Sequence, residues 1–140
     1  MASNGGFARR LSLVFAAGSV GGLANSAAVW ACGRLGFAEA AGVKMAPAFT
    51  AAWLYPRVVW GGIWGVLFLL PFLRKGPFLR ALVFSLSPTA VQLFVIFPMR
   101  DNKGMMGLDL GTLTPLFVIG YNAVWGLSAA VWLVIVGERR

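Results

Sequence analysis

The sequence contains no histidine, a single cysteine and only four acidic residues. The absence of histidine excludes a histidine-ligated metal or haem, and it excludes any histidine-based proton relay. The lone Cys32 excludes an internal disulfide and a cysteine-rich metal site, and we interpret it as an inert packing residue. We therefore expect neither a metal nor another cofactor.

All four acids lie outside the long apolar runs, at Glu39, Asp101, Asp109 and Glu138. Transport coupled to protons or cations usually relies on carboxylates inside the membrane, so the sequence disfavours it. The chain also has no nucleophile with a neighbouring base and no phosphate-binding loop. These absences together predict a protein that is not an enzyme.

The residues that are present are mainly apolar. The chain has 140 residues, enough for one domain, of which 59% are hydrophobic and 11% charged. A soluble domain of this size cannot bury so much apolar surface, so lipid must be its solvent. The net charge of +8 comes from short basic clusters between the apolar runs. Such clusters are typical of membrane flanks, and we expect no nucleic-acid partner.

Four apolar segments reach the roughly 20 residues that a helix needs to cross a bilayer. They span about residues 11–33, 47–73, 77–98 and 110–137. The breaks "FLRKGPFLR" and "PMRDNKGMMGLDL" are rich in basic residues, glycine and proline, while "RLGFAEAAGVKMAP" is softer and suits a short interfacial helix. The sequence predicts an all-α membrane protein, a single four-span domain that forms a four-helix bundle.

The start of the chain has the basic and apolar regions of a signal peptide, with small residues near Ala24. The apolar character continues through "AVWAC", so we favour an uncleaved first span. Four spans place both termini and the middle loop on one side of the membrane. That side carries seven basic residues against five on the other, which predicts cytoplasmic termini. The two sets are Arg9, Arg10, Arg74, Lys75, Arg80, Arg139 and Arg140, and Arg34, Lys44, Arg57, Arg100 and Lys103.

The tripeptide Val-Trp-Gly occurs twice, at residues 59–61 and 124–126, an offset of 65 (124 − 59). Identities at this offset occur at Gly42/Gly107, Val59/Val124, Trp60/Trp125, Gly61/Gly126 and Val66/Val131. A duplication would give two helical hairpins related by an axis along the membrane normal, a parallel repeat. The alternative is that both helices use tryptophan at the interface and glycine for packing. Both interpretations stay open.

Small residues recur at spacings that place them on one helix face, because residues four apart share a face. Such small-xxx-small rows let membrane helices approach closely. One row lies in the first span, a second continues from Arg57, and a third continues from Asn122. We predict helix-packing roles for Gly18, Gly22, Gly61, Gly65 and Gly126.

Polar residues of all four spans fall at a similar depth, in the outer half of the bilayer if the termini are cytoplasmic. They predict a polar pocket that opens outward, with ligand- or lipid-binding candidates Arg57, Asn25, Gln92, Asn122 and Thr89. The amides have an alternative role as interhelical hydrogen-bond donors and acceptors. Arg57 either binds a lipid phosphate or small anion, or caps carbonyl groups. In both cases we expect it to point into the bundle, within reach of at least one of the three amides.

The stretch "VQLFVIFPMRDNKGMMGL", followed by "NAVWGLSAA", resembles the second half of YagU-type bacterial inner-membrane proteins. The shared features are Gln92-Leu93-Phe94, Phe97-Pro98-Met99 and Trp125 in the next helix. The resemblance covers about a third of the chain and implies a small multi-pass protein of the bacterial inner membrane.

Two hypotheses about function follow. The first is a non-catalytic structural or accessory component, which packs against membrane lipid and forms a homo-oligomer or joins other membrane subunits. It rests on the small-residue rows, the short loops and the absence of acids within the spans. The alternative is a small channel or carrier for an anionic or neutral solute, which uses the outward-facing polar pocket around Arg57.

Overall fold

The computed structural model describes residues 4–136, and these residues form helices and connections without a strand. In chain order the elements are α1 (Asn4–Arg34), α2 (Phe37–Ala40), α3 (Ala51–Trp64), the 3-10 helix η1 (Gly65–Leu69), α4 (Pro77–Val91), the π-helix η2 (Gln92–Arg100), the 3-10 helix η3 (Met105–Leu110) and α5 (Thr114–Val136). The all-α prediction is confirmed, and α2 is the short helix expected between the first two spans.

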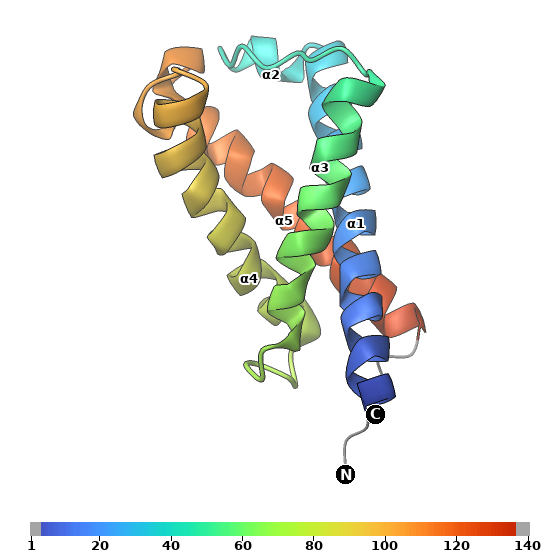
Figure 1. Ribbon diagram of the computed structural model, residues 1–140. Helices are drawn as coiled ribbons and strands as arrows, with labels where there is room; N and C mark the ends of the chain where they lie inside the picture. Colours follow the sequence, from blue (N-terminus) through green and yellow to red (C-terminus); the bar gives the residue numbers. More distant parts are fainter. Residues whose placement is uncertain (1–3, 137–140) are drawn as a thin grey trace.

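Four helical segments are long and apolar enough to cross a membrane: Gly5–Arg34, Ala51–Leu69, Pro77–Arg100 and Thr114–Val136. Their direction alternates, so the described ends of α1 and α5 and the 70–76 connection lie at one end of the molecule (Figure 1). The α2 helix and the 101–113 connection lie at the other end, which we call the α2 end. This is the predicted four-span arrangement; which end is cytoplasmic remains a prediction.

The helices begin and end at different residues from the predicted spans, for local reasons. The second span begins at Ala51 rather than near residue 47, because the Thr50 hydroxyl accepts a hydrogen bond from the Trp53 amide (3.2 Å) and caps the helix. The third span continues past Pro98 to Arg100 as a π-helix, and the fourth begins only at Thr114, after η3. The first span is helical from Asn4. Gly137, Glu138, Arg139 and Arg140 lie outside the described residues.

Helices α1 and α3 pack backbone against backbone through the predicted glycines. A Cβ added to Gly18 would lie 2.2 Å from the carbonyl oxygen of Gly61, and one on Gly65 would lie 2.3 Å from that of Val14. A Cβ on Gly22 would meet the Arg57 carbonyl oxygen at 2.7 Å. No side chain larger than hydrogen fits at these points, so the glycine rows set how closely the two helices approach.

Helices α4 and α5 form a second hairpin with a similar crossing. A Cβ on Gly126 would lie 2.6 Å from the carbonyl oxygen of Ala81. Helix α1 packs against both α3 and α5 and thereby joins the two hairpins. The hairpins cross in the half nearer the chain ends and diverge toward the α2 end (Figure 1). In the diverging half, α3 and α4 make no extended contact, and α4 meets the α3 segment at η1.

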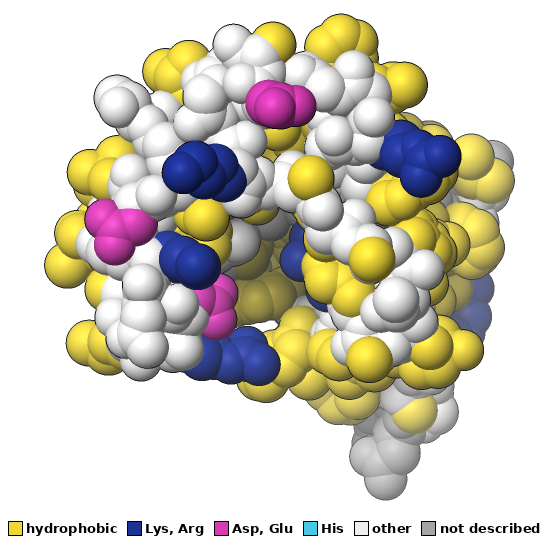
Figure 2. Space-filling view, turned by 90° about the horizontal axis from the view of Figure 1, so that it is seen from above, with side chains coloured by type: hydrophobic (Ala, Val, Ile, Leu, Met, Phe, Trp, Pro, Cys, Tyr) yellow, Lys and Arg dark blue, Asp and Glu magenta, His cyan; other side chains and the backbone are white. Residues whose placement is uncertain are grey.

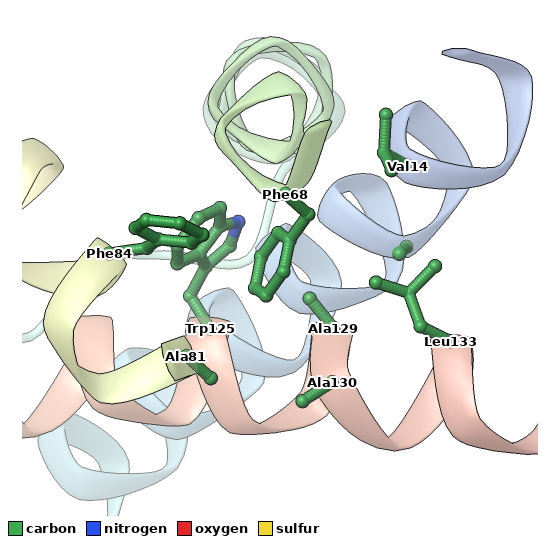
Figure 3. Close-up of a cluster of buried hydrophobic side chains, with 9 residues drawn as sticks. Val14, Phe68, Ala81, Phe84, Trp125, Ala129, Ala130 and Leu133 are labelled. Carbon is green, nitrogen blue, oxygen red and sulfur yellow. The ribbon is translucent and has the colours of Figure 1, made fainter. Parts of the chain in front are cut away.

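The core lies where the hairpins cross, and it is built around three aromatic rings. Phe68 of η1 packs edge-on against Phe84 of α4, with ring centres 5.4 Å apart, and its ring centre lies 6.0 Å from that of Trp125. Figure 3 shows Phe68 between Trp125 and Val14 of α1, above the small residues of α5. The indole Nε1 of Trp125 donates to the carbonyl oxygens of Gly18 (3.1 Å) and Gly61 (3.2 Å). One side chain of α5 thus binds both helices of the other hairpin.

Arg80 secures the other end of this core. Its guanidinium donates to the carbonyls of Phe68, near the end of η1, and of Leu70, the residue after η1, and lies 5.3 Å from the centre of the Phe84 ring. Arginine suits this position because the end of a helix leaves carbonyl groups without intrahelical donors. Arg80, predicted from the sequence to be a basic residue flanking the membrane, therefore also connects α4 to the segment that follows α3.

The two candidate repeats have partly matching environments. Gly42 and Gly107 both have positive φ, at 77° and 69°. Gly61 packs on the backbone of α1, and Gly126 packs in the same way on α4. The tryptophans differ, because Trp60 is 58% exposed whereas Trp125 is 3% exposed. The duplication stays a hypothesis, now with matching glycines and diverged tryptophans.

The topology predicts labelling from opposite sides of the membrane. Single cysteines replacing Gly76, in the 70–76 connection, and the exposed Lys103, in the 101–113 connection, should react from opposite faces in intact cells, in a Cys32→Ala background. With cytoplasmic termini, an impermeant maleimide should reach only Lys103→Cys before the cells are permeabilised. Labelling of both positions from outside would contradict the four-span arrangement.

The glycine crossing predicts a steric loss of stability. Gly18→Ala should lower the free energy of unfolding by about 1–3 kcal/mol, because its Cβ would lie 2.2 Å from a carbonyl oxygen of the neighbouring helix. Gly120→Ala in α5 is the matched control: its Cβ would meet no atom within 4 Å, and we expect no loss. For each variant, the fraction of protein that stays monodisperse in detergent is measured after heating to a series of temperatures, and the midpoint temperature of its loss is compared with that of the wild type. Equal midpoints for the two would show that close approach is not required.

Candidate functional site

A pocket of about 460 Å³ lies between the two hairpins, in the half where they diverge. Seen from the α2 end, the face is hollowed in its middle, with Lys and Arg side chains on the wall and edge of the hollow, an acidic side chain also at its edge, and hydrophobic side chains deeper inside (Figure 2). All four spans contribute to its lining: Gly22, Asn25, Pro56, Arg57, Trp60, Gly61, Trp64, Pro88, Gln92, Ile96, Arg100, Asn122 and Trp125.

Arg57 crosses from α3 to α1 at the wall of this pocket. Its Nε donates to the Ser26 hydroxyl (2.9 Å) and its Nη2 to the Asn25 side-chain oxygen (2.6 Å), while the guanidinium lies 4.6 Å from the Trp53 ring centre. The side chain thus points into the bundle and reaches one of the three predicted amides. Within residues 4–136, no group accepts a hydrogen bond from Nη1.

The partners of Arg57 are neutral, and none of the described residues that line the pocket is acidic. Arg100, from the end of η2, adds a second guanidinium to the lining. The pocket therefore contains two arginines without a carboxylate. In a span that excludes water, a charge with neutral partners only is incompletely compensated.

A chain of hydrogen bonds fixes Asn25 and links all four spans. The Asn25 amide donates to the Tyr121 carbonyl (2.7 Å) and to the Asn122 side-chain oxygen (3.3 Å). The Asn122 amide donates to the Thr89 hydroxyl (3.0 Å), which itself donates to the Ser85 carbonyl (2.8 Å). Each amide is oriented by the acceptor to which it donates, so the side-chain oxygen of Asn25 faces Arg57. In this structure Asn25, Asn122 and Thr89 hold helices together and position the arginine.

The π-helix η2 brings Arg100 to the pocket. An α-helix advances about 100° per residue, so Arg100, twelve residues after Pro88, would lie about 120° around a regular helix. A π turn of about 4.4 residues advances about 82° per residue, so the eight steps from Gln92 to Arg100 return Arg100 to within about 25° of Pro88. Gln92 and Ile96, at intervals of four, fall on the same face. The change of helix type from Gln92 onward therefore makes one continuous wall.

Trp125 forms the floor of the pocket. Its ring lines the pocket and belongs to the same buried cluster as Phe68 and Phe84, which do not line the pocket (Figure 3). Those aromatic rings fill the space where the hairpins cross, so the pocket is closed toward the chain ends. Its geometry is that of a pocket closed at this end and not of a continuous pore.

The sequence-based candidates occupy different places around the pocket. Asn25, Arg57, Gln92 and Asn122 line it, whereas Thr89 is buried behind Asn122. The Gln92 side chain lies on the wall without a hydrogen bond to other described residues. Sequence reasoning missed Arg100, assigned to a loop, and the floor residue Trp125. No signal in the sequence identified Arg100, because on a regular α-helix it would lie about 120° away from Pro88.

The fold and site define a four-span α-helical protein with a cationic pocket between its two hairpins. Comparison of the chain with protein-family models, with curated proteins and with solved structures finds no match. The resemblance to YagU-type proteins stays a prediction that rests on the sequence.

The hydrogen-bond chain predicts a coupling between α4 and α5. Asn122→Ala and Thr89→Val each remove one end of the 3.0 Å bond, and the double variant should lose less stability than the sum of the two. We expect a coupling energy of about 0.6–2 kcal/mol, as for other hydrogen bonds between membrane helices. Thermal or denaturant unfolding of the four proteins in one detergent gives this value. Strict additivity would mean that the bond contributes nothing.

Proposed function

We propose that this protein is a non-catalytic membrane protein that binds an anionic group, of phosphate or carboxylate type, in the pocket beside Arg57. The observation that carries the proposal is a half-buried guanidinium with neutral partners and, among residues 4–136, no acceptor for one nitrogen and no acid in the pocket lining, which includes a second arginine. An oxyanion at this place would supply the missing negative charge and accept from the guanidinium through charge-assisted bonds.

The pocket is organised for such a ligand before it binds. The hydrogen-bond chain from Thr89 to Asn25 holds Arg57 in position, so little side-chain freedom remains to be lost on binding. The Gln92 amide on the opposite wall offers further donors. A pocket of about 460 Å³ lies within the range of about 300–1,000 Å³ usual for small-ligand sites.

The closed floor distinguishes this proposal from the two functions inferred from sequence. An open channel would need a path through Trp125, Phe68 and Phe84, which pack against one another here. A carrier would need the hairpins to move relative to each other at this crossing. The accessory-component hypothesis rests on the small-residue rows, the short loops and the absence of acids within the spans, and the predicted glycines pack against helices of the same chain. With cytoplasmic termini, the pocket faces the outer side of a bacterial inner membrane.

Binding should depend on Arg57. Arg57→Met is expected to weaken the binding of inorganic phosphate or of phosphatidic acid, whichever binds the wild type, roughly ten- to hundredfold, because a charged hydrogen-bond donor is lost. Arg57→Lys should recover part of the affinity, since it keeps the charge without the fork of donors. Ligand-dependent thermal stabilisation of the purified protein, together with native mass spectrometry, measures the change.

Arg34→Met is the matched control, because Arg34 is an exposed arginine at the same end and does not line the pocket. It should bind as the wild type does. Equal affinity of the wild type and a folded Arg57→Met protein for both anions, or binding of neither anion by the wild type, would contradict the proposal.

A further inference from the structure

The pocket between the hairpins is bounded by two helices that do not close against each other. Its lining includes Trp60 and Trp64 from α3 and Gln92 and Ile96 from η2. Over this half α3 packs on α1, and α3 makes no extended contact with α4 or η2 within the described chain. Only side chains such as these lie between the pocket and the bilayer along the α3–η2 edge.

Trp60 marks the edge of this opening. Its side chain lines the pocket and is nevertheless 58% exposed, so one part of it faces inward while the rest faces the surroundings. Its neighbours on α3, Val59 and Ile63, are exposed apolar residues in the middle of a membrane-spanning helix. In a membrane-spanning α3 the exposed part of Trp60 faces hydrocarbon, so this side chain contacts both the pocket and the lipid.

The lining of the pocket combines two kinds of chemistry. The guanidinium groups of Arg57 and Arg100 and the amides of Asn25, Gln92 and Asn122 are cationic or polar. The rings of Trp60 and Trp64, with Ile96 and the two prolines, are apolar, and Trp60 and Ile96 belong to the two helices that border the α3–η2 edge. A ligand that matches both kinds has an anionic head and an apolar chain attached to it.

We propose that the ligand of this site is an anionic membrane lipid with a phosphate head, which enters sideways between α3 and η2. This rests on the proposed anion-binding function and names the source of the anion. The head lies between Arg57 and Arg100, where charge complementarity places it, and the start of its chain passes over Trp60 and Ile96. The volume of about 460 Å³ holds the head and the first part of a chain, so the remaining hydrocarbon stays in the bilayer through the open edge.

The test uses the full-length protein in liposomes that contain a phosphatidic acid with a diazirine in one acyl chain. After photolysis, peptide mass spectrometry should find adducts concentrated on the α3 and η2 residues of the opening, above all Trp60, Trp64 and Ile96. The matched neutral lipid, a diacylglycerol with the same photoreactive chain, should label the exposed apolar residues of all four spans without this concentration. Arg57→Met should reduce the phosphatidic acid adducts at the opening to the diacylglycerol level.

Two further variants keep the result interpretable. Arg100→Gln alters an exposed residue at the rim and should reduce the same adducts about threefold or more, so the proposal is still tested if Arg57→Met does not fold. Trp60→Ala should weaken the binding of phosphatidic acid about three- to tenfold and leave the binding of inorganic phosphate unchanged, because only the lipid has a chain to pack there. Trp132→Ala, on a partly exposed tryptophan away from the pocket, is the control.

The outcomes separate this inference from the proposed function. If inorganic phosphate stabilises the protein through Arg57 but no phosphatidic acid adducts form at the opening, the lipid proposal is contradicted and the proposed anion site is supported. Adducts at the opening that are equal for phosphatidic acid and diacylglycerol would overturn the role of charge. Absence of both phosphate binding and head-group-dependent adducts would overturn the two proposals together.

Discussion

The bundle depends on the burial of one indole N–H group. Trp125 donates to two carbonyl oxygens, of Gly18 and Gly61, that belong to different helices of the opposite hairpin. These carbonyls are within reach because glycine leaves the helix surface open at the crossing, and the indole N–H must find an acceptor because lipid offers none. The same contact brings α1, α3 and α5 together and places the Trp125 ring as the floor of the pocket.

Above this floor the hairpins are free to diverge. Small residues draw the helices together at the crossing, whereas α3 and η2 present tryptophan, isoleucine and arginine where close packing would require small residues. The glycine face of α3 packs on α1 from Gly65 to the Arg57 backbone, whereas α3 makes no extended contact with α4 or η2 in the described chain. The pocket occupies the space between the hairpins that this packing leaves open.

Sequence reasoning predicted the four spans because hydropathy over some 20 residues is a strong signal. It predicted that Arg57 points inward because the spacing of four to Gly61 identifies the face that meets another helix. It could not predict that Arg100 joins the site, since the position depends on a π-helix whose wider turn has no marker in the residue pattern. Trp125 was grouped with interfacial tryptophans, because composition does not distinguish an indole that finds acceptors inside the bundle from one at the headgroups.

The hydrogen-bond chain that begins at Arg57 runs in one direction only. Arg57 donates to Asn25, Asn25 to Asn122, Asn122 to Thr89, and Thr89 to a carbonyl of its own helix. A ligand that draws the guanidinium toward itself lengthens the first bond and weakens the acceptor role of Asn25. Because the later bonds join α1 to α5 and α5 to α4, the proposed anion binding predicts a thermodynamic link between occupancy of the pocket and the angle between the hairpins. By reciprocity, lateral pressure or bilayer thickness that changes this angle also changes the affinity of the pocket.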